Sequence, residues 1–173
     1  MEIWDLYTES RQLSGKTHIR GEELPDDLYH LVVHAWIVNS KGEYLISQRS
    51  ASRTAFPLMW ECVGGSVLAG ESSLEGVLRE IQEEVGLSLS NCTGKLVDSV
   101  CRKTVNGKKF NDILDIWLFP YNGNVLLGNA TTDEVAQVQW MTPSQIQTLL
   151  DSGDLVDTLS YFFEKFVPLT EGN

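Results

Sequence analysis

The segment between Gly70 and Gly86 constrains the fold of this chain more than any other. Ser72 can accept a hydrogen bond from the backbone of a first helical turn, and Glu75, three residues later, completes a capping box. Gly86 supplies the left-handed residue that commonly ends a helix. The sequence therefore predicts a helix from about residue 73 to residue 85.

This predicted helix has an apolar stripe beside an acidic arc. At about 100° per residue, its apolar residues fall within a stripe that must pack on the rest of the protein. These residues are Leu74, Val77, Leu78, Ile81 and Val85. Glu80, Glu83 and Glu84 occupy the adjoining arc, because positions i, i+3 and i+4 lie on one side of a helix. Gly76 lies one turn before Glu80, and we expect its missing side chain to leave room for a ligand.

Three carboxylates on one arc repel one another, so a compensating charge is expected nearby. Glutamate oxygens are hard ligands of the kind that Mg²⁺ and Mn²⁺ prefer, and Mg²⁺ often bridges carboxylates and substrate phosphates. Arg79 is also placed to pair with Glu75 or Glu83, which would hold a carboxylate and soften the repulsion. A Glu-rich helix is more often a plain solvated face, so the spacing alone leaves both interpretations open.

The charge of the chain restricts its partners. Among 173 residues, 24 are acidic and 13 are basic, which gives a formal net charge of −11. Such a field repels nucleic acid and anionic membranes, and no apolar run approaches the roughly 20 residues that span a bilayer. Three cysteines without a CxxC pair suit a reducing compartment. We therefore expect a cytoplasmic protein that binds neither nucleic acid nor a membrane.

No repeat, low-complexity tract or Pro/Gly-rich linker divides the sequence, which predicts a single domain over residues 1–173. Residues 1–29 are predicted to form a hairpin-like N-terminal extension, with a strand at 3–7 and a turn at 14–16. Such an extension could pair strand edges between two subunits, so a homodimer is one assembly that the sequence leaves open.

Short strands are predicted on both sides of the acidic helix. Apolar runs joined by turn residues indicate two hairpins, and two shorter runs indicate single strands. The hairpins comprise 31–38 with 44–48 and 95–105 with 110–119, the second joined by the turn dipeptide Asn106-Gly107. The single strands are 60–63, ending at Gly64 and Gly65, and 135–140. Thr142 and Pro143 then begin a helix, and a second short helix closes the chain. Many strands that do not alternate with the few helices indicate an α+β fold.

A longer string around the acidic helix carries a specific resemblance. Its fixed positions are Gly65, Glu71, Arg79, Glu80, Ile81, Glu83, Glu84, Gly86 and Leu87. At these spacings the string resembles the signature of the Nudix hydrolases without a mismatch, and nine constrained positions across 23 residues make chance agreement remote. The resemblance extends from about Leu31 to Trp140.

The resemblance implies a fold and a reaction. The fold would be a Nudix α/β/α sandwich with a mixed β-sheet and a signature loop-helix-loop. The reaction would be a hydrolysis that depends on Mg²⁺ or Mn²⁺, in which water attacks phosphorus of a nucleoside diphosphate linked to another moiety. The residues of the signature act on the diphosphate, so they do not indicate which groups are attached to it.

The resemblance also implies roles for residues of the acidic helix. Carried over by position, Glu83 and Glu84 would be the principal metal ligands. Glu80 would be a metal ligand or the catalytic base, and Glu71 and Arg79 would be supporting catalytic residues.

Other implied contacts lie outside the helix. The backbone around Gly65 would bind a metal through a carbonyl or contact phosphate, and Glu134 is the candidate base from a distant loop. An ordinary acidic turn explains Glu134 equally well. Arg49 and Arg53 could reach a phosphate by bidentate hydrogen bonds, or they could remain solvated.

Three segments of the extension, Glu2–Tyr7, Gly15–Lys16 and Arg20–Glu22, also resemble a neighbouring branch of the same fold, isopentenyl diphosphate isomerase. That family uses a cysteine just before the equivalent of Gly64, where this chain has Val63. Cys62 lies one residue earlier and would face the opposite side of a strand. Isomerisation is therefore disfavoured, and a non-catalytic nucleotide-binding module is the other alternative.

Overall fold

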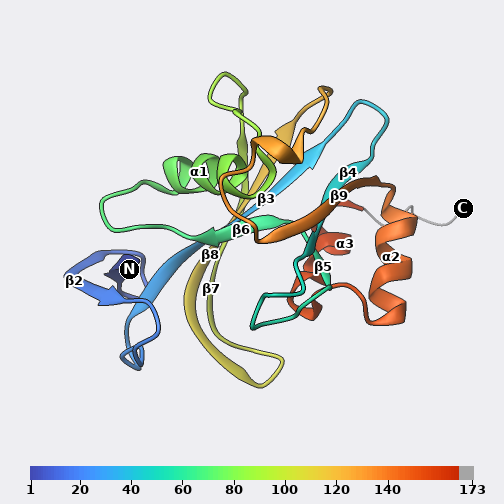
Figure 1. Cartoon of the computed structure of the whole chain (residues 1–173). Helices are drawn as coiled ribbons and strands as arrows, with labels where there is room; N and C mark the ends of the chain where they lie inside the picture. Colours follow the sequence, from blue (N-terminus) through green and yellow to red (C-terminus); the bar gives the residue numbers. More distant parts are fainter. Residues whose placement is uncertain (168–173) are drawn as a thin grey trace, which may run out of the picture.

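The computed structural model describes residues 1–167 and forms an α/β/α sandwich around a mixed nine-stranded sheet (Figure 1). The strands are β1 (Ile3–Tyr7), β2 (Leu13–Ile19), β3 (Tyr29–Val38), β4 (Tyr44–Arg49), β5 (Trp60–Glu61), β6 (Val63–Ser66), β7 (Lys95–Val105), β8 (Lys108–Pro120) and β9 (Val135–Met141). The helices are α1 (Ser73–Val85), α2 (Pro143–Ser152) and α3 (Tyr161–Phe166), with the short 3₁₀ turns η1 (Leu127–Asn129) and η2 (Asp157–Leu159). The predicted α+β class and sandwich are confirmed. Within the described residues, no helix is long and apolar enough to cross a bilayer.

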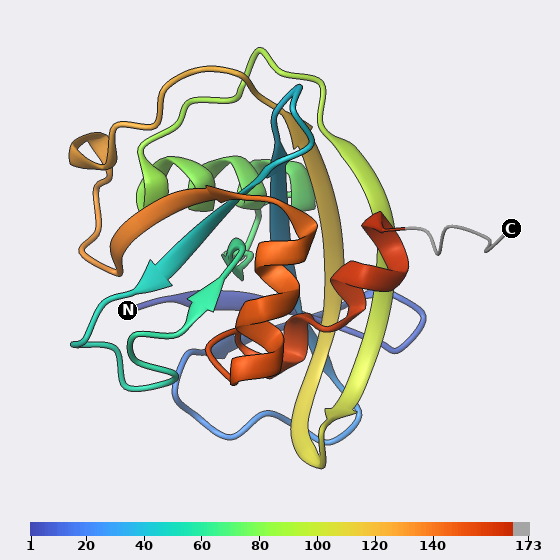
Figure 2. The same cartoon turned by 90° about the vertical axis from the view of Figure 1, so that its right-hand side faces the viewer.

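Strand β3 is the centre of the sheet. It runs parallel to β8 over nine residue pairs and antiparallel to β1, β4 and β6. Val33 and Ile37 belong to the core on the side of α1, whereas Trp36 belongs to the core beneath α2 and α3. Figure 2 shows α2 and α3 on the face opposite α1. Because helices cover both faces, β3 is apolar on both sides rather than alternating with polar residues.

Helix α1 begins and ends where the sequence predicts. Ser72 and Glu75 form the capping box, and Gly86 adopts a left-handed conformation with φ 71°. The helix packs on the sheet through three residues without exposed surface, namely Val77, Ile81 and Val85. This packing fixes the rotation of the helix about its axis, and with it the direction of every glutamate on the helix.

Two expectations about the faces of α1 were wrong. Leu74 is 42% exposed, whereas Glu84 is only 5% exposed, so the buried stripe is rotated toward the acidic arc. Gly76 does not leave room for a ligand, because a Cβ there would lie 2.8 Å from Cγ2 of Val67. The missing side chain instead lets the helix approach the loop that follows β6.

The strand predicted at 60–63 is two strands. β5 pairs with β4 and β6 pairs with β3, so the chain changes neighbours at Cys62. Gly64 and Gly65 lie inside β6 rather than after a strand. A Cβ at Gly64 would lie 2.3 Å from the carbonyl oxygen of Val33, so only glycine permits this approach of β6 to β3.

The N-terminal extension forms the predicted hairpin, but its turn lies elsewhere. β1 and β2 pair antiparallel, and the chain reverses at 8–11, where Arg11 has φ 61°. Gly15, with φ 77°, lies within β2, beside a register shift opposite Asp5 and Tyr7. The glycine that suggested a turn therefore accommodates a bulge. β1 also pairs with β3, which joins the hairpin to the main sheet.

Two buried aspartates of β8 anchor neighbouring segments. Arg11 donates to both carboxylate oxygens of Asp115 at 2.5 Å each. Arg102 donates to the two oxygens of Asp112 at 2.7 and 2.6 Å. The side chain of Asp115 has no exposed surface, and such a carboxylate must be paired to be tolerated. Sequence reasoning assigned neither aspartate a role. Arg11 is 104 positions from Asp115, whereas Arg102, on β7, lies opposite Asp112.

Removing Arg11 should destabilise the protein. In Arg11→Met the buried Asp115 carboxylate loses its bidentate partner, and we expect the free energy of unfolding to fall by about 3 kcal/mol in urea denaturation near neutral pH. Lys16→Met, an exposed change on the same hairpin, should stay within about 0.5 kcal/mol of the wild type. Similar values for the two variants would contradict the anchoring role.

Candidate active site

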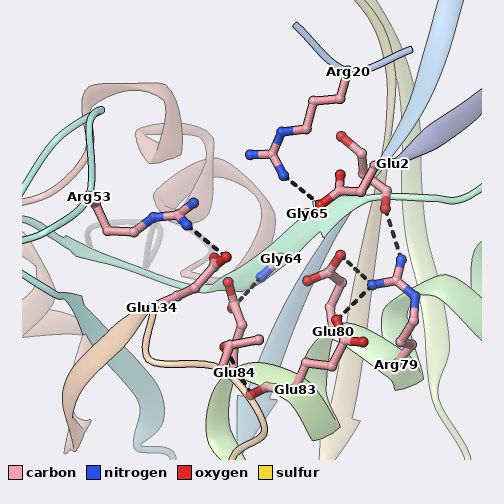
Figure 3. Close-up of a pocket in the computed structure, with 12 residues that line it drawn as sticks. Glu2, Arg20, Arg53, Gly64, Gly65, Arg79, Glu80, Glu83, Glu84 and Glu134 are labelled. Atoms are coloured by element: carbon pink, nitrogen blue, oxygen red, sulfur yellow. Dashed lines mark hydrogen bonds and ion pairs between the residues drawn. The ribbon is translucent and has the colours of Figure 1, made fainter. Parts of the chain in front are cut away.

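A cavity of about 160 Å³ lies between the open end of the N-terminal hairpin, strand β6, helix α1 and the loop before β9 (Figure 3). It is lined by Glu2, Arg20, Arg53, Gly64, Gly65, Ser66, Arg79, Glu80, Glu83, Glu84, Thr132 and Glu134. The structure thus brings seven of the predicted site residues to one place, and two others, Glu71 and Arg49, lie outside this lining. Five glutamates against three arginines give the cavity a net negative charge.

Arg79 connects most of the acidic groups. Its Nε and Nη2 atoms donate to the two oxygens of Glu71 at 2.8 and 3.1 Å, and Nη2 also donates to the Ser66 carbonyl at 2.9 Å. Its Nη1 atom donates to Glu80 at 2.8 Å and to Glu83 at 2.9 Å. Burial lowers the pKa of Arg79, but the hydrogen bonds and charges of its glutamate partners outweigh burial and raise the pKa above its usual value. Arg79 is therefore a permanent cation with all five N–H donors engaged.

Glu71 acts through Arg79 rather than at the cavity itself. One of its oxygens also accepts the backbone N–H of Leu68 at 3.0 Å, within the loop that precedes α1. The Glu71 carboxylate therefore fixes both the loop and the guanidinium, which is a positioning role.

The carboxylate of Glu80 lies directly against Gly65. A Cβ at Gly65 would come within 2.4 Å of Glu80 Oε1, so the position requires glycine for the carboxylate to stay where it is. The side chain of Glu80 is 13% exposed, and burial raises its pKa to about 7 although Arg79 opposes the shift. Near neutral pH this group can therefore both bind and release a proton.

Glu84 is the most buried carboxylate of the cavity. It accepts one backbone N–H, from Gly64, at 3.2 Å. Burial raises its pKa well above the usual value, and the nearby charges of Glu61 and Glu80 raise it further. A buried carboxylate that is crowded by two others is an arrangement that a hard divalent cation would relieve.

The carboxylates do not enclose a cation as they stand. In residues 1–167, no three acidic, histidine or cysteine side chains converge closely enough to hold a metal ion. Arg79 draws Glu80 and Glu83 toward itself, while Glu84 points to the backbone of Gly64. A metal ion would therefore need Glu80 and Glu83 to turn from the guanidinium, which is a change of side-chain rotamers only.

The loop before β9 brings Glu134 to the cavity. The N–H groups of Thr131 and Thr132 donate to the carbonyl of Glu83 at 3.0 and 3.1 Å, which ties this loop to the end of α1. Glu134 pairs with Arg53 at 2.7 Å, and both side chains are partly exposed. The segment is thus part of the cavity wall rather than an isolated acidic turn.

The two arginines after β4 behave differently. Arg49 pairs with Glu61 at 2.5 Å and donates to the carbonyl of Ala55 at 2.8 Å, so its guanidinium is engaged away from the cavity lining. Arg53 is the one that lines the cavity. Sequence reasoning gave Glu2 and Arg20 no role in the site, although both lie in segments that resemble the isomerase branch. They reach the cavity only after the hairpin folds back on the sheet.

Known proteins resemble this chain over most of its length. The family model described as NUDIX domain matches residues 28–162. An uncharacterized Nudix hydrolase of Listeria monocytogenes is 36% identical over 166 residues, covering 94% of this chain and 91% of the relative. An isopentenyl-diphosphate Delta-isomerase of Citrobacter koseri is 30% identical over 129 residues, covering 73% of this chain and 68% of the relative. A crystal structure of a Deinococcus radiodurans protein has the same fold, with a TM-score of 0.74 at 21% identity, covering 90% of this chain and 92% of the other.

The raised pKa of Glu80 makes stability depend on pH. Between its ordinary pKa of 4.5 and its folded value of about 7, the folded state holds a proton that the unfolded state has lost. The metal-free protein should therefore become less stable as the pH rises through this interval, with Glu80 contributing on the order of 2–3 kcal/mol. Urea denaturation in the presence of a chelator, at about pH 5 and about pH 8, measures this difference.

Glu80→Gln should reduce the loss of stability across that interval, because the amide does not titrate. Glu164→Gln, outside the cavity on α3, is the matched control and should retain the full loss. A loss of equal size in Glu80→Gln and in the wild type would contradict the assignment.

Proposed function

The chain belongs to the NUDIX domain family, and on that basis we propose that it is a Mg²⁺- or Mn²⁺-dependent hydrolase acting on a nucleoside diphosphate linked to another moiety. It cleaves a phosphoanhydride bond by attack of water at phosphorus. The observation that carries this proposal is that Glu80, Glu83 and Glu84, all from α1, line one cavity together with Gly65.

The donor set of the cavity fits a hard divalent cation. Glu83 and Glu84 would be the principal ligands, together with the carbonyl of Gly65. Glu80 would be a further ligand if it is not the catalytic base. When bound, the cation supplies charge neutralisation on the phosphate oxygens and lowers the pKa of a coordinated water. Arg79 neutralises Glu80 and Glu83 when they face it, and its contacts with Glu71 do not depend on them.

Two carboxylates are placed to accept the proton of the attacking water. Glu80, with its pKa raised to about 7 by burial, is matched to proton transfer near neutral pH. Glu134 reaches the same cavity from the loop before β9, where Arg53 holds it. Of the two arginines considered for a phosphate contact, only Arg53 lines the cavity, because the guanidinium of Arg49 is engaged with Glu61.

The isomerase alternative has support from the relatives of that name, but the cysteine is in the wrong place for it. Cys62 is buried in the core cluster that contains Trp36 and Phe162, whereas its neighbour Val63 belongs to the core on the side of α1. Burial raises the pKa of the Cys62 thiol well above its usual value, which suits a core residue rather than a proton donor or nucleophile. Hydrolysis is therefore the function that the site supports best.

A substrate screen tests this proposal. With Mg²⁺ or Mn²⁺, the protein should release phosphate or a nucleoside monophosphate from at least one member of a panel of nucleoside triphosphates, sugar nucleotides, dinucleotides and coenzymes. Glu83→Gln should lower kcat by at least about 100-fold, because it removes a charged ligand of the divalent cation that neutralises the reacting phosphate. Circular dichroism should show that the fold of this variant is intact. Glu164→Gln on α3 is the matched control and should keep full activity.

The other outcomes identify the rival functions. A shift of the double bond of isopentenyl diphosphate without phosphate release would support the isomerase. Calorimetric uptake of Mn²⁺ and nucleotide without turnover of any panel member would support a binding module.

The variant Gly65→Ala should change the activity of the site without unfolding the protein. The new methyl group would meet the carboxylate of Glu80 at 2.4 Å, and because that carboxylate ends a flexible side chain, it should shift rather than unfold the protein. We expect kcat/KM to fall by about 100-fold and the stability to change by less than about 1 kcal/mol. Gly64→Ala is the contrast, since its methyl group would meet the backbone carbonyl of Val33 at 2.3 Å and should destabilise the fold. Full activity of Gly65→Ala would contradict the role of Glu80.

A further inference from the structure

The N-terminal hairpin is fastened to the loop that carries Glu71. The backbone N–H of Ala69 donates to the carbonyl of Ile3 at 2.8 Å, and the N–H of Gly70 donates to the carboxylate of Asp5 at 2.7 Å. These two hydrogen bonds link the position of the hairpin to that of the loop before α1.

An aromatic stack holds the hairpin on the central strand. The indole of Trp4 lies 4.3 Å from the ring of His30 on β3 and 5.9 Å from that of His18 on β2. All three residues are buried. Two residues beyond His18, the backbone N–H of Arg20 donates to the carbonyl of Glu2 at 3.1 Å. This packing presents the side chains of Glu2 and Arg20 at the edge of the cavity.

Three arginines line the cavity, and they differ in what they can still bind. Arg79 has all its N–H groups engaged, and Arg53 pairs with Glu134. The side chain of Arg20 is 51% exposed, and within residues 1–167 its only side-chain partner is Glu2, at 2.7 Å. Figure 3 shows Arg20 at the top of the view and Arg53 at the left, with the glutamates of α1 below both.

The Arg20 and Glu2 pair is easily exchanged. An ion pair between two exposed side chains contributes little, because water and salt screen it. A phosphate can accept two parallel hydrogen bonds from one guanidinium, which makes it a stronger partner than a single contact with Glu2. An anionic group entering the cavity would therefore take Arg20 from Glu2.

The size and chemistry of the cavity restrict that group. Its volume of about 160 Å³ is below the roughly 300 Å³ at which pockets begin to enclose a drug-sized ligand. Among the described residues that line it, none is aromatic, so there is no ring on which a base could stack. The space beside Arg20 suits a phosphoryl group and not a second nucleoside.

We propose that Arg20 binds the terminal phosphoryl group of the substrate, which makes the N-terminal hairpin part of the active site. Given the proposed hydrolase function, on which this inference rests, the substrate class is a nucleotide or other organic diphosphate or triphosphate with a free phosphoryl end. Substrates whose terminal phosphate is esterified are disfavoured, because the ester removes a charged oxygen and adds bulk beside Arg20.

Binding of an uncleavable probe tests Arg20 independently of catalysis. Calorimetry in excess Mg²⁺ should show that Arg20→Gln binds methylenebisphosphonate about 10- to 100-fold more weakly than the wild type. The same variant should bind the P,P′-dimethyl ester of that probe with an affinity close to that of the wild type. Lys16→Gln removes an equal charge from the same hairpin and should leave both affinities unchanged, which controls for the general electrostatic field.

Steady-state kinetics provide the second measurement. For a nucleoside triphosphate that the wild type hydrolyses, Arg20→Gln should raise KM by about 10- to 100-fold and change kcat less, while hydrolysis of its γ-methyl ester should change little. Glu2→Gln should bind methylenebisphosphonate at least as tightly as the wild type, because it frees Arg20 and removes a negative charge from the cavity.

The outcomes separate this inference from the proposed function. Arg20-dependent binding of the bisphosphonate without turnover of any nucleotide would leave the Arg20 assignment standing and refute the hydrolase. Equal losses for the free and esterified probes, equal losses in Arg20→Gln and Lys16→Gln, weaker binding by Glu2→Gln, or no binding by the wild type would overturn the Arg20 assignment.

Discussion

The guanidinium of Arg79 is the interaction on which the rest of the site depends. It joins Glu71 of the loop before α1, the carbonyl of Ser66 on β6, and Glu80 and Glu83 of the helix itself. Without it, a partly buried cluster of carboxylates would have only mutual repulsion, which is strong where water is scarce. One planar cation with five donors therefore sets both the geometry and the charge balance of three separate elements.

A carboxylate of the cavity and the core residues of α1 lie on one face of the helix. Glu84 follows Ile81 by three positions and is buried with it, so the acidic arc merges into the stripe that packs on the sheet. This arrangement places a carboxylate where its ionised form is disfavoured, as the raised pKa of Glu84 indicates. Burying this carboxylate lowers the stability of the fold, as is common in sites that are arranged to bind a charged ligand.

Features with local signals could be predicted from the sequence. The bounds of α1 follow from Ser72, Glu75 and Gly86, because capping depends on residues within one turn of the helix. The hairpin of β7 and β8 was predicted from Asn106 and Gly107 for the same reason.

Features that depend on distant partners could not be predicted. Nothing near Cys62 indicates that the chain changes strands there, since the choice is made by β3 and β4. Arg20 reaches the cavity only through the fold of the hairpin. The roles of individual site residues remain predictions, because the signature names the glutamates without specifying which one takes a proton.

The parallel pairing of β3 with β8 also has a consequence for how the molecule acquires its shape. His30 pairs with Asp112, 82 positions further along the chain, and the intervening segment contains β4, β6, α1 and β7. Closing so long a loop costs conformational entropy before the contacts between its ends can stabilise the structure. Topologies of high contact order fold slowly for this reason. The cavity lined by Glu80, Glu83 and Glu84 forms only when β6 pairs with β3 and α1 packs on both strands. We therefore expect this cavity to form late in folding, after the local hairpins.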